Sequence, residues 1–118
     1  MTVGVLGFGG AEIGYQEVDQ QTIDRLLNAA LDAGLNVIDT AECYKGSEEA
    51  IGKAVGSRRN EYFLFTKVGH MDPGDEGWTA ASIGRSIDRS LQRLRTDRLD
   101  LVQLHSCERA LLERGECI

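Results

Sequence analysis

The feature that most constrains this chain is a regular alternation between short apolar runs and longer segments with the spacing of amphipathic helices. Runs such as YFLFTK and LDLVQLH are apolar almost throughout, as in strands that are covered on both faces of a parallel sheet. Strands that alternate with helices predict βαβ units, in either a doubly wound open sheet or a (β/α)₈ barrel. The predicted strands are Val3–Leu6, Asn36–Asp39, Tyr62–Lys67 and Leu99–His105.

The predicted helices carry start and stop signals in the local sequence. Asp19, Ser47 and Thr79 each precede a helical pattern and belong to the residue types that cap helix N-termini. Gly34 and Gly56 follow the first two patterns, where glycine commonly ends a helix. Residues 108–118 predict a loop and the first turn of another helix. The apolar positions at helical spacing are Ile23, Leu26, Leu27, Ala30 and Leu31 in the first helix, Ala50, Ile51, Ala54 and Val55 in the second, and Ile83, Ile87, Leu91 and Leu94 in the third.

The glycine-rich turn GFGGAE, from Gly7 to Glu12, invites comparison with nucleotide-binding loops. A dinucleotide fingerprint needs G-x-G-x-x-G at the start of a helix, but Glu12 stands where the third glycine belongs. A Walker loop would need a Gly-Lys-Ser/Thr sequence, which does not follow. These residues alone therefore predict a flexible turn in preference to direct cofactor contact. A second loop is predicted at HMDPGDEG, residues 70–77.

Charge and composition argue against several classes of function. The net charge of −6, without a basic stripe, argues against a nucleic-acid partner. No apolar run approaches the roughly 20 residues of a membrane helix, and no signal peptide is visible. The three cysteines lack CxxC spacing, which favours reduced thiols in the cytoplasm, and no residues have the spacing of a metal site. A thiol redox role for Cys43 is a weaker alternative, because no resolving cysteine is near it in sequence.

Three predicted strands end on titratable side chains, which are Asp39, Lys67 and His105. Taken singly, each has a structural explanation: a cap, a side chain that extends to solvent, and a hydrogen-bonded core imidazole. In a parallel barrel these strand ends share one face, which is where active sites lie. Because Tyr44 follows Asp39 on the adjoining loop, we favour a joint functional role for the four residues.

The four side chains suit the reduction of a carbonyl group. An ammonium close to a phenol favours the phenolate, and a carboxylate holds that ammonium in place. Such a phenol can donate a proton to a carbonyl oxygen, while a histidine orients the same oxygen. The hydride would come from a cofactor that the protein positions.

At these residues the chain resembles the N-terminal portion of the aldo-keto reductases. The matching segments are LGFGGAEIG, ALDAGLNVIDTAECYKGSEEAIGKAV, FLFTKVG and SIDRSLQRLRTDRLDLVQLHS, and they follow the order of the family from Val3 to Ser106. The resemblance implies a (β/α)₈ barrel that uses NADPH without a Rossmann fold and reduces a small aldehyde or ketone to an alcohol. It implies a catalytic tetrad of Asp39, Tyr44, Lys67 and His105, with Tyr44 as proton donor, and cofactor contacts from Gly9, Gly10 and Asp39.

The chain is short for this family. Eight βα units need about 250 residues, so we expect an α/β fold that is a partial barrel of about three and a half units. By the same resemblance, the other half stacks on the nicotinamide and grips the adenosine phosphate. We therefore expect residues 1–118 to be a single incomplete domain from a longer enzyme. The alternatives are a degenerate remnant and a non-catalytic half-barrel that associates with another chain, or with itself, through exposed strand edges.

Overall fold

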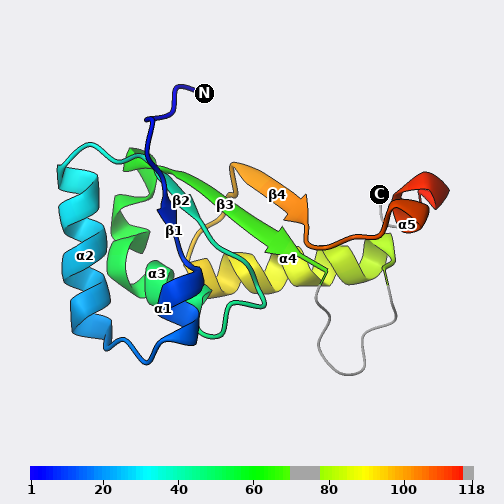
Figure 1. Ribbon diagram of the computed structural model, residues 1–118, viewed down its shortest axis with the longest axis horizontal. Helices are drawn as coiled ribbons and strands as arrows, with labels where there is room; N and C mark the ends of the chain where they lie inside the picture. Colours follow the sequence, from blue (N-terminus) through cyan, green and yellow to red (C-terminus); the bar gives the residue numbers. More distant parts are fainter. Residues whose placement is uncertain (70–77, 116–118) are drawn as a thin grey trace.

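The computed structural model describes residues 1–69 and 78–115. α2 and α5 lie at opposite ends of the molecule (Figure 1). None of the described helices has the length and apolar character needed to cross a bilayer. The strands are β1 (Phe8–Gly9), β2 (Val37–Asp39), β3 (Phe63–Val68) and β4 (Leu101–Leu104), and the helices are α1 (Ala11–Tyr15), α2 (Gln20–Asp32), α3 (Ser47–Val55), α4 (Ala80–Leu94) and α5 (Arg109–Arg114), with a 3₁₀ helix, η1 (Gly56–Glu61).

The strands form one parallel sheet in which each strand pairs with its successor, in the order β1-β2-β3-β4 (Figure 1). Ile38 lies opposite Leu64, and Phe65 lies opposite Leu101. A doubly wound sheet reverses its strand order at a switch point, whereas a barrel adds each new strand to the same edge. The sequential order therefore favours the barrel over the open sheet, with four strands of it present among the described residues.

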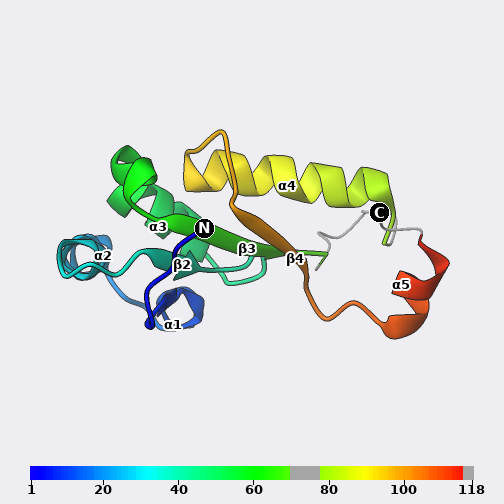
Figure 2. The same ribbon diagram turned by 90° about the horizontal axis from the view of Figure 1, so that it is seen from above.

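The two faces of the sheet differ in burial. Along β3, Leu64, Thr66 and Val68 are fully buried, whereas the alternate residues Phe65 and Lys67 are partly exposed. Successive side chains of a strand point to opposite faces, so the buried set faces the helices. Figure 2 shows α3 and α4 on the same side of the sheet. The main core includes Ile23, Leu27, Leu31, Ile38, Ile51, Val55 and Leu64.

Two of the three predicted helix caps are confirmed. Asp19 and Thr79 each accept a hydrogen bond from the backbone N–H three residues on, at 2.9 Å and 3.2 Å. The prediction for Ser47 is wrong by one residue, because Gly46 is the cap and Ser47 lies buried in the first turn of α3. Its hydroxyl donates to the carbonyl of Gly10 at 2.8 Å, so a tertiary contact replaces the local one.

The predicted first strand, Val3–Leu6, is wrong. These residues form no strand, and the side chains of Val5 and Leu6 are exposed. β1 instead begins at Phe8, which pairs with Ile38 and packs against the main core. Apolar character predicted the earlier run, but a strand also needs a paired neighbour, and pairing with β2 begins at Phe8.

Other predictions have mixed outcomes. The turn after β1 contains the short helix α1, which the prediction of a flexible turn missed. Leu26, assigned to the inner face of α2, is 46% exposed. The helix predicted near the C-terminus is confirmed as α5. The HMDPGDEG loop lies outside the described residues.

A largely buried ion pair ties the starts of β3 and β4 together. Arg59 donates to the Asp100 carboxylate at 2.5 Å and to the carbonyl of Tyr62 at 2.8 Å. The same carboxylate accepts a hydrogen bond from the Leu64 N–H at 2.8 Å. Burial opposes ionisation of Asp100, but the hydrogen bonds from Leu64 and Arg59 outweigh it and lower the pKa of this carboxyl.

We predict that Asp100→Asn lowers the free energy of unfolding at neutral pH by about 1.5–3 kcal/mol, the range for a hydrogen bond to a charged group. Because the folded pKa of Asp100 is lowered, its contribution is complete above the ordinary value of 3.8 and is lost as the pH falls through the folded pKa. Urea unfolding as a function of pH should therefore show a shallower loss of stability in acid for Asp100→Asn. The exposed Asp97→Asn is the control, and parallel pH profiles for wild type and Asp100→Asn would contradict the prediction.

The contact between α3 and α4 depends on Gly52. A Cβ at this position would overlap the backbone of Arg93 and lie 2.8 Å from the carbonyl carbon of Leu94. At Gly84, in α4, no described atom outside its own helix lies within 4 Å of the corresponding position. A Cβ is therefore excluded at Gly52 by the facing helix, whereas Gly84 has room for one.

We predict opposite effects of alanine at these two glycines. Gly52→Ala should lower the free energy of unfolding by about 1–3 kcal/mol, since it forces the two helices apart. Gly84→Ala should raise it by about 0.5–1 kcal/mol, since alanine is the better helix former. The midpoints of urea unfolding measure both effects, and a shift in the same direction for the two variants would count against the packing described.

Candidate active site

The carboxyl ends of β2, β3 and β4 bring three of the predicted site residues to one edge of the sheet. Asp39 is the last residue of β2, Lys67 lies one residue before the end of β3, and His105 directly follows β4. The His105 N–H donates to the carbonyl of Val68 at 2.8 Å, which extends the pairing of β3 and β4 by one residue. The common edge expected from the strand pattern is therefore present.

Lys67 and Asp39 form an ion pair between neighbouring strands. Lys67 Nζ donates to Asp39 Oδ2 at 2.5 Å and to the carbonyl oxygen of Thr40 at 2.9 Å. The lysine side chain is 16% exposed and the aspartate side chain 35% exposed. Partly buried pairs are screened by salt less than surface pairs. The pair therefore fixes the ammonium close to the loop that follows β2.

Tyr44 is brought to this ion pair by a tight turn after β2. Its N–H donates to the carbonyl of Ala41 at 3.0 Å. The centroid of its ring lies 5.1 Å from Lys67 Nζ and 5.8 Å from the centroid of the His105 ring, which meets it edge-on. Tyr15 of α1 packs edge-on against the same ring at 5.8 Å. The structure thus brings all four predicted catalytic residues together.

Glu42 contributes to this region although no sequence pattern pointed to it. Its side chain is 4% exposed, and Oε1 accepts hydrogen bonds from the Gly69 N–H at 2.7 Å and from Ser86 Oγ at 3.2 Å. Arg89 Nη2 lies 3.6 Å from the other carboxylate oxygen. These contacts join the loop after β2 to the end of β3 and to α4. In sequence, a carboxylate in a polar loop cannot be distinguished from a solvated one.

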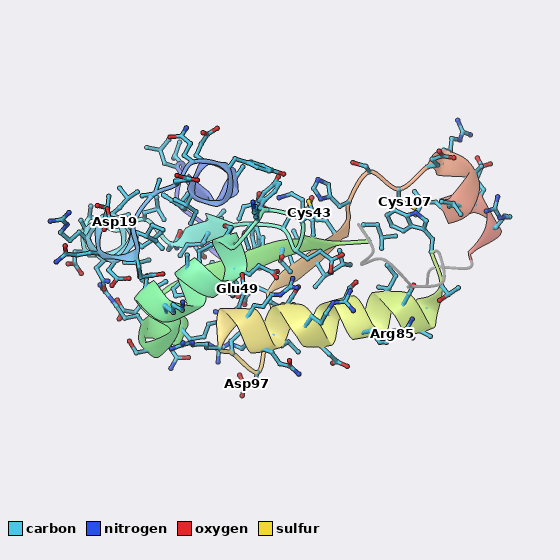
Figure 3. The ribbon with its side chains drawn as sticks, turned by 90° about the horizontal axis from the view of Figure 1, so that it is seen from below. Asp19, Cys43, Glu49, Arg85, Asp97 and Cys107 are labelled. Carbon is cyan, nitrogen blue, oxygen red and sulfur yellow. The ribbon has the colours of Figure 1, made fainter. Side chains whose placement is uncertain are left out.

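Cys43 contacts His105 across the loops that follow β2 and β4. The distance from Sγ to Nδ1 is 3.3 Å. Figure 3 shows Cys43 on the side of the sheet away from α4. Burial raises the pKa of the Cys43 thiol, which disfavours the thiolate needed for redox or nucleophilic chemistry. The structure therefore weakens the thiol redox alternative and gives Cys43 a contact with a predicted site residue.

A buried polar layer supports the strand ends from the helix side of the sheet. Thr66 Oγ1 donates to Glu48 Oε1 at 2.7 Å, and Arg93 Nη1 lies 3.5 Å from the other oxygen of Glu48. Burial raises the pKa of Glu48, although these hydrogen bonds oppose the shift. Thr40 and Ser47 share a hydrogen bond of 2.9 Å between their hydroxyls. The layer holds α3 against the two strands that carry the ion pair.

The two glycines predicted to contact a cofactor differ in their surroundings. The Gly10 N–H donates to the carbonyl of Asp39 at 2.7 Å, and a Cβ on Gly10 would lie 2.7 Å from Ser47 Oγ. Gly9 pairs with Asp39 in the sheet, and no described atom lies within 4 Å of the place where its Cβ would be. Close packing therefore explains glycine at position 10, whereas Gly9 leaves open space at the strand ends.

Together these groups can deliver a proton and stabilise the charge that remains. Tyr44 carries a donor hydroxyl, Lys67 supplies a fixed positive charge near its ring, and His105 supplies a second hydrogen-bonding group. This set can protonate an oxygen that gains negative charge during a reaction.

Comparison with known proteins identifies the family. The profile of the Aldo/keto reductase family matches residues 5–112. The chain is 37% identical over 112 residues to an uncharacterized oxidoreductase, YqkF, of Bacillus subtilis, a match that covers 89% of this chain and 36% of that protein.

Solved structures of this family share the fold. The aldo-keto reductase AKR11C1 of Bacillus halodurans, in its holo form, has a TM-score of 0.84 at 37% identity, and the match covers 100% of this chain and 41% of that one. An aldo-keto reductase from Klebsiella pneumoniae in complex with NADPH has a TM-score of 0.76 at 32% identity, with 97% and 43% covered. This chain thus spans less than half the length of these relatives, and the expected partial (β/α)₈ barrel is confirmed. The chain belongs to the aldo/keto reductase family.

Proposed function

We propose that this chain carries the proton-donating residues of a site that reduces an aldehyde or ketone to an alcohol with NADPH. The observation that carries the proposal is the position of Tyr44, with its ring 5.1 Å from the Lys67 ammonium and edge-on to His105. Membership of the aldo/keto reductase family supports it. The NADPH complex of the Klebsiella pneumoniae relative supports the choice of cofactor.

In the proposed reaction, Tyr44 donates its hydroxyl proton to the carbonyl oxygen of the substrate. Lys67 stabilises the phenolate that remains on Tyr44, and Asp39 holds the ammonium through the 2.5 Å contact. His105 hydrogen-bonds the same oxygen and orients the carbonyl. The chemistry that NADPH supplies when bound is the hydride for the carbonyl carbon.

The described residues fit one end of a nicotinamide cofactor. Gly9 leaves open space at the strand ends, beside a partly exposed Asp39 whose Oδ1 accepts a long hydrogen bond of 3.5 Å from Gln103. We assign Gly9, Gly10 and Asp39 to the nicotinamide and ribose end. We further propose that the chain is one part of a longer enzyme, and that the rest of its barrel holds the adenosine phosphate.

The substrate we propose is a small carbonyl compound, because the converging groups act on a single polarised oxygen. We place the reaction in the cytoplasm. Cys43 is a free thiol, which suits a reducing compartment.

We predict that Tyr44→Phe lowers kcat for aldehyde reduction by about 10²–10⁴-fold, because it removes the proton donor but keeps the ring. Tyr15→Phe is the matched control, since Tyr15 is exposed and packs edge-on against Tyr44. It should leave kcat within about twofold of wild type. The assay follows NADPH absorbance with the purified chain and a panel of aldehydes and ketones.

The assigned role is contradicted if Tyr44→Phe turns over as fast as wild type. If the wild-type chain shows no turnover with any member of the panel, autonomous catalysis by residues 1–118 is excluded, which favours the proposal that they are one part of a longer enzyme.

The second candidate is a non-catalytic half-barrel that associates with another chain. Apolar side chains exposed around the sheet favour it: Leu101, on β4, is 44% exposed, and Leu6, before β1, is 76% exposed. β1 and β4 are the outer strands of the sheet, and outer strands are common sites of association. Under this proposal, a second copy of the chain covers the open face.

For this candidate, light scattering at micromolar concentration should show a monodisperse dimer. Leu101→Asp should shift the chain toward monomer, because it places a charge on the apolar face. Leu112→Asp is the matched control, since Leu112 is also 44% exposed but lies on α5. A wild-type monomer, or equal effects of the two substitutions, would argue against association through the sheet.

A further inference from the structure

The contact between Cys43 and His105 has no role in the reaction as proposed above. Sγ lies 3.3 Å from Nδ1, and the two residues are 62 positions apart in the chain. Tyr44 directly follows Cys43, and its ring meets the His105 ring at an interplanar angle of 89°. The thiol therefore touches one nitrogen of the imidazole that packs on the proposed proton donor.

The direction of this hydrogen bond follows from the chemistry of the two groups. A neutral imidazole has one nitrogen that accepts and one that carries hydrogen, and a thiol is a weak donor and a weak acceptor. Burial raises the pKa of the Cys43 thiol, so the sulfur keeps its hydrogen. The stronger acceptor of the pair is the imidazole lone pair. The 3.3 Å contact itself fits either direction, but these properties favour a thiol that donates to Nδ1, with the imidazole hydrogen on Nε2.

We propose that Cys43 is a positioning residue that holds His105 as the Nε2–H tautomer. The inference rests on the proposed carbonyl reduction, in which His105 must donate a hydrogen bond to the substrate oxygen. With the hydrogen on Nδ1, Nε2 would present a lone pair to an oxygen that gains negative charge. The bond from the His105 N–H to Val68 fixes the backbone at the end of β4, and the thiol selects the tautomer.

The test is the tautomer of His105, read from nitrogen-15 NMR spectra that correlate the ring nitrogens with the ring protons. The other histidine of the chain, His70, is replaced by glutamine in every sample. Spectra are recorded at a pH of about 8, above the ordinary pKa of histidine. We expect the Nε2–H form in the chain that keeps Cys43.

Two substitutions separate the hydrogen bond from the packing. Cys43→Ser should keep the Nε2–H form, because its hydroxyl can still donate to Nδ1. Cys43→Ala should lower the ratio of Nε2–H to Nδ1–H by about threefold to tenfold, which corresponds to the loss of one hydrogen bond. Where the chain turns over, Cys43→Ala should also lower kcat by up to about tenfold, with KM little changed and with recovery in Cys43→Ser.

An Nδ1–H tautomer of His105 in the chain that keeps Cys43 overturns the proposal. The proposal is also overturned if the ratio of Nε2–H to Nδ1–H is the same in Cys43→Ala as in the chain that keeps Cys43. Circular dichroism reports whether Cys43→Ala folds. If Cys43→Ala does not fold, the comparison is made between the chain that keeps Cys43 and the Cys43→Ser variant. Different His105 tautomers in these two proteins overturn the proposal. The spectra require no turnover, so the positioning role and the proposed function can fail separately.

Discussion

The ion pair between Asp39 and Lys67 is the interaction on which the rest of the site depends. It joins the ends of β2 and β3, so it can form only when these strands adopt their parallel register. It also holds the ammonium 5.1 Å from the centroid of the Tyr44 ring. Loss of Asp39 would leave the Lys67 ammonium, whose side chain is 16% exposed, without its carboxylate partner, which costs more than the loss of a surface pair. Strand pairing and the chemistry proposed for Tyr44 are therefore coupled.

The sheet separates the groups that stabilise the fold from those proposed to react. Because side chains alternate along a strand, β3 contributes Thr66 to the buried layer under α3 and Lys67 to the site on the other face. The ion pair of Arg59 and Asp100 lies at the amino ends of β3 and β4, away from the site. This division matches a general property of parallel barrels, in which the carboxyl ends of the strands carry function and the amino ends carry stability.

The parts of the structure that depend on residues close together in sequence, or on the common direction of parallel strands, could be predicted from the sequence. Asp19 and Thr79 are caps that bond three residues away, and the titratable strand ends share one edge because parallel strands share a direction. The cap predicted at Ser47 is wrong because a distant carbonyl accepts its hydroxyl hydrogen, and the first predicted strand is displaced because its position depends on a partner in β2. The contact of Cys43 with His105 joins residues 62 positions apart, so no local sequence pattern could predict it.

In the proposed reaction, Asp39 and Lys67 act as one unit. The most direct measurement is a double-mutant cycle on kcat/KM for NADPH-dependent aldehyde reduction, with Asp39→Asn, Lys67→Met and the double variant. Residues that act as a unit are strongly non-additive, so the double variant should be within about threefold of the slower single variant. If the losses of the two single variants multiply in the double variant, Asp39 and Lys67 act independently, and the proposed coupling between them is contradicted.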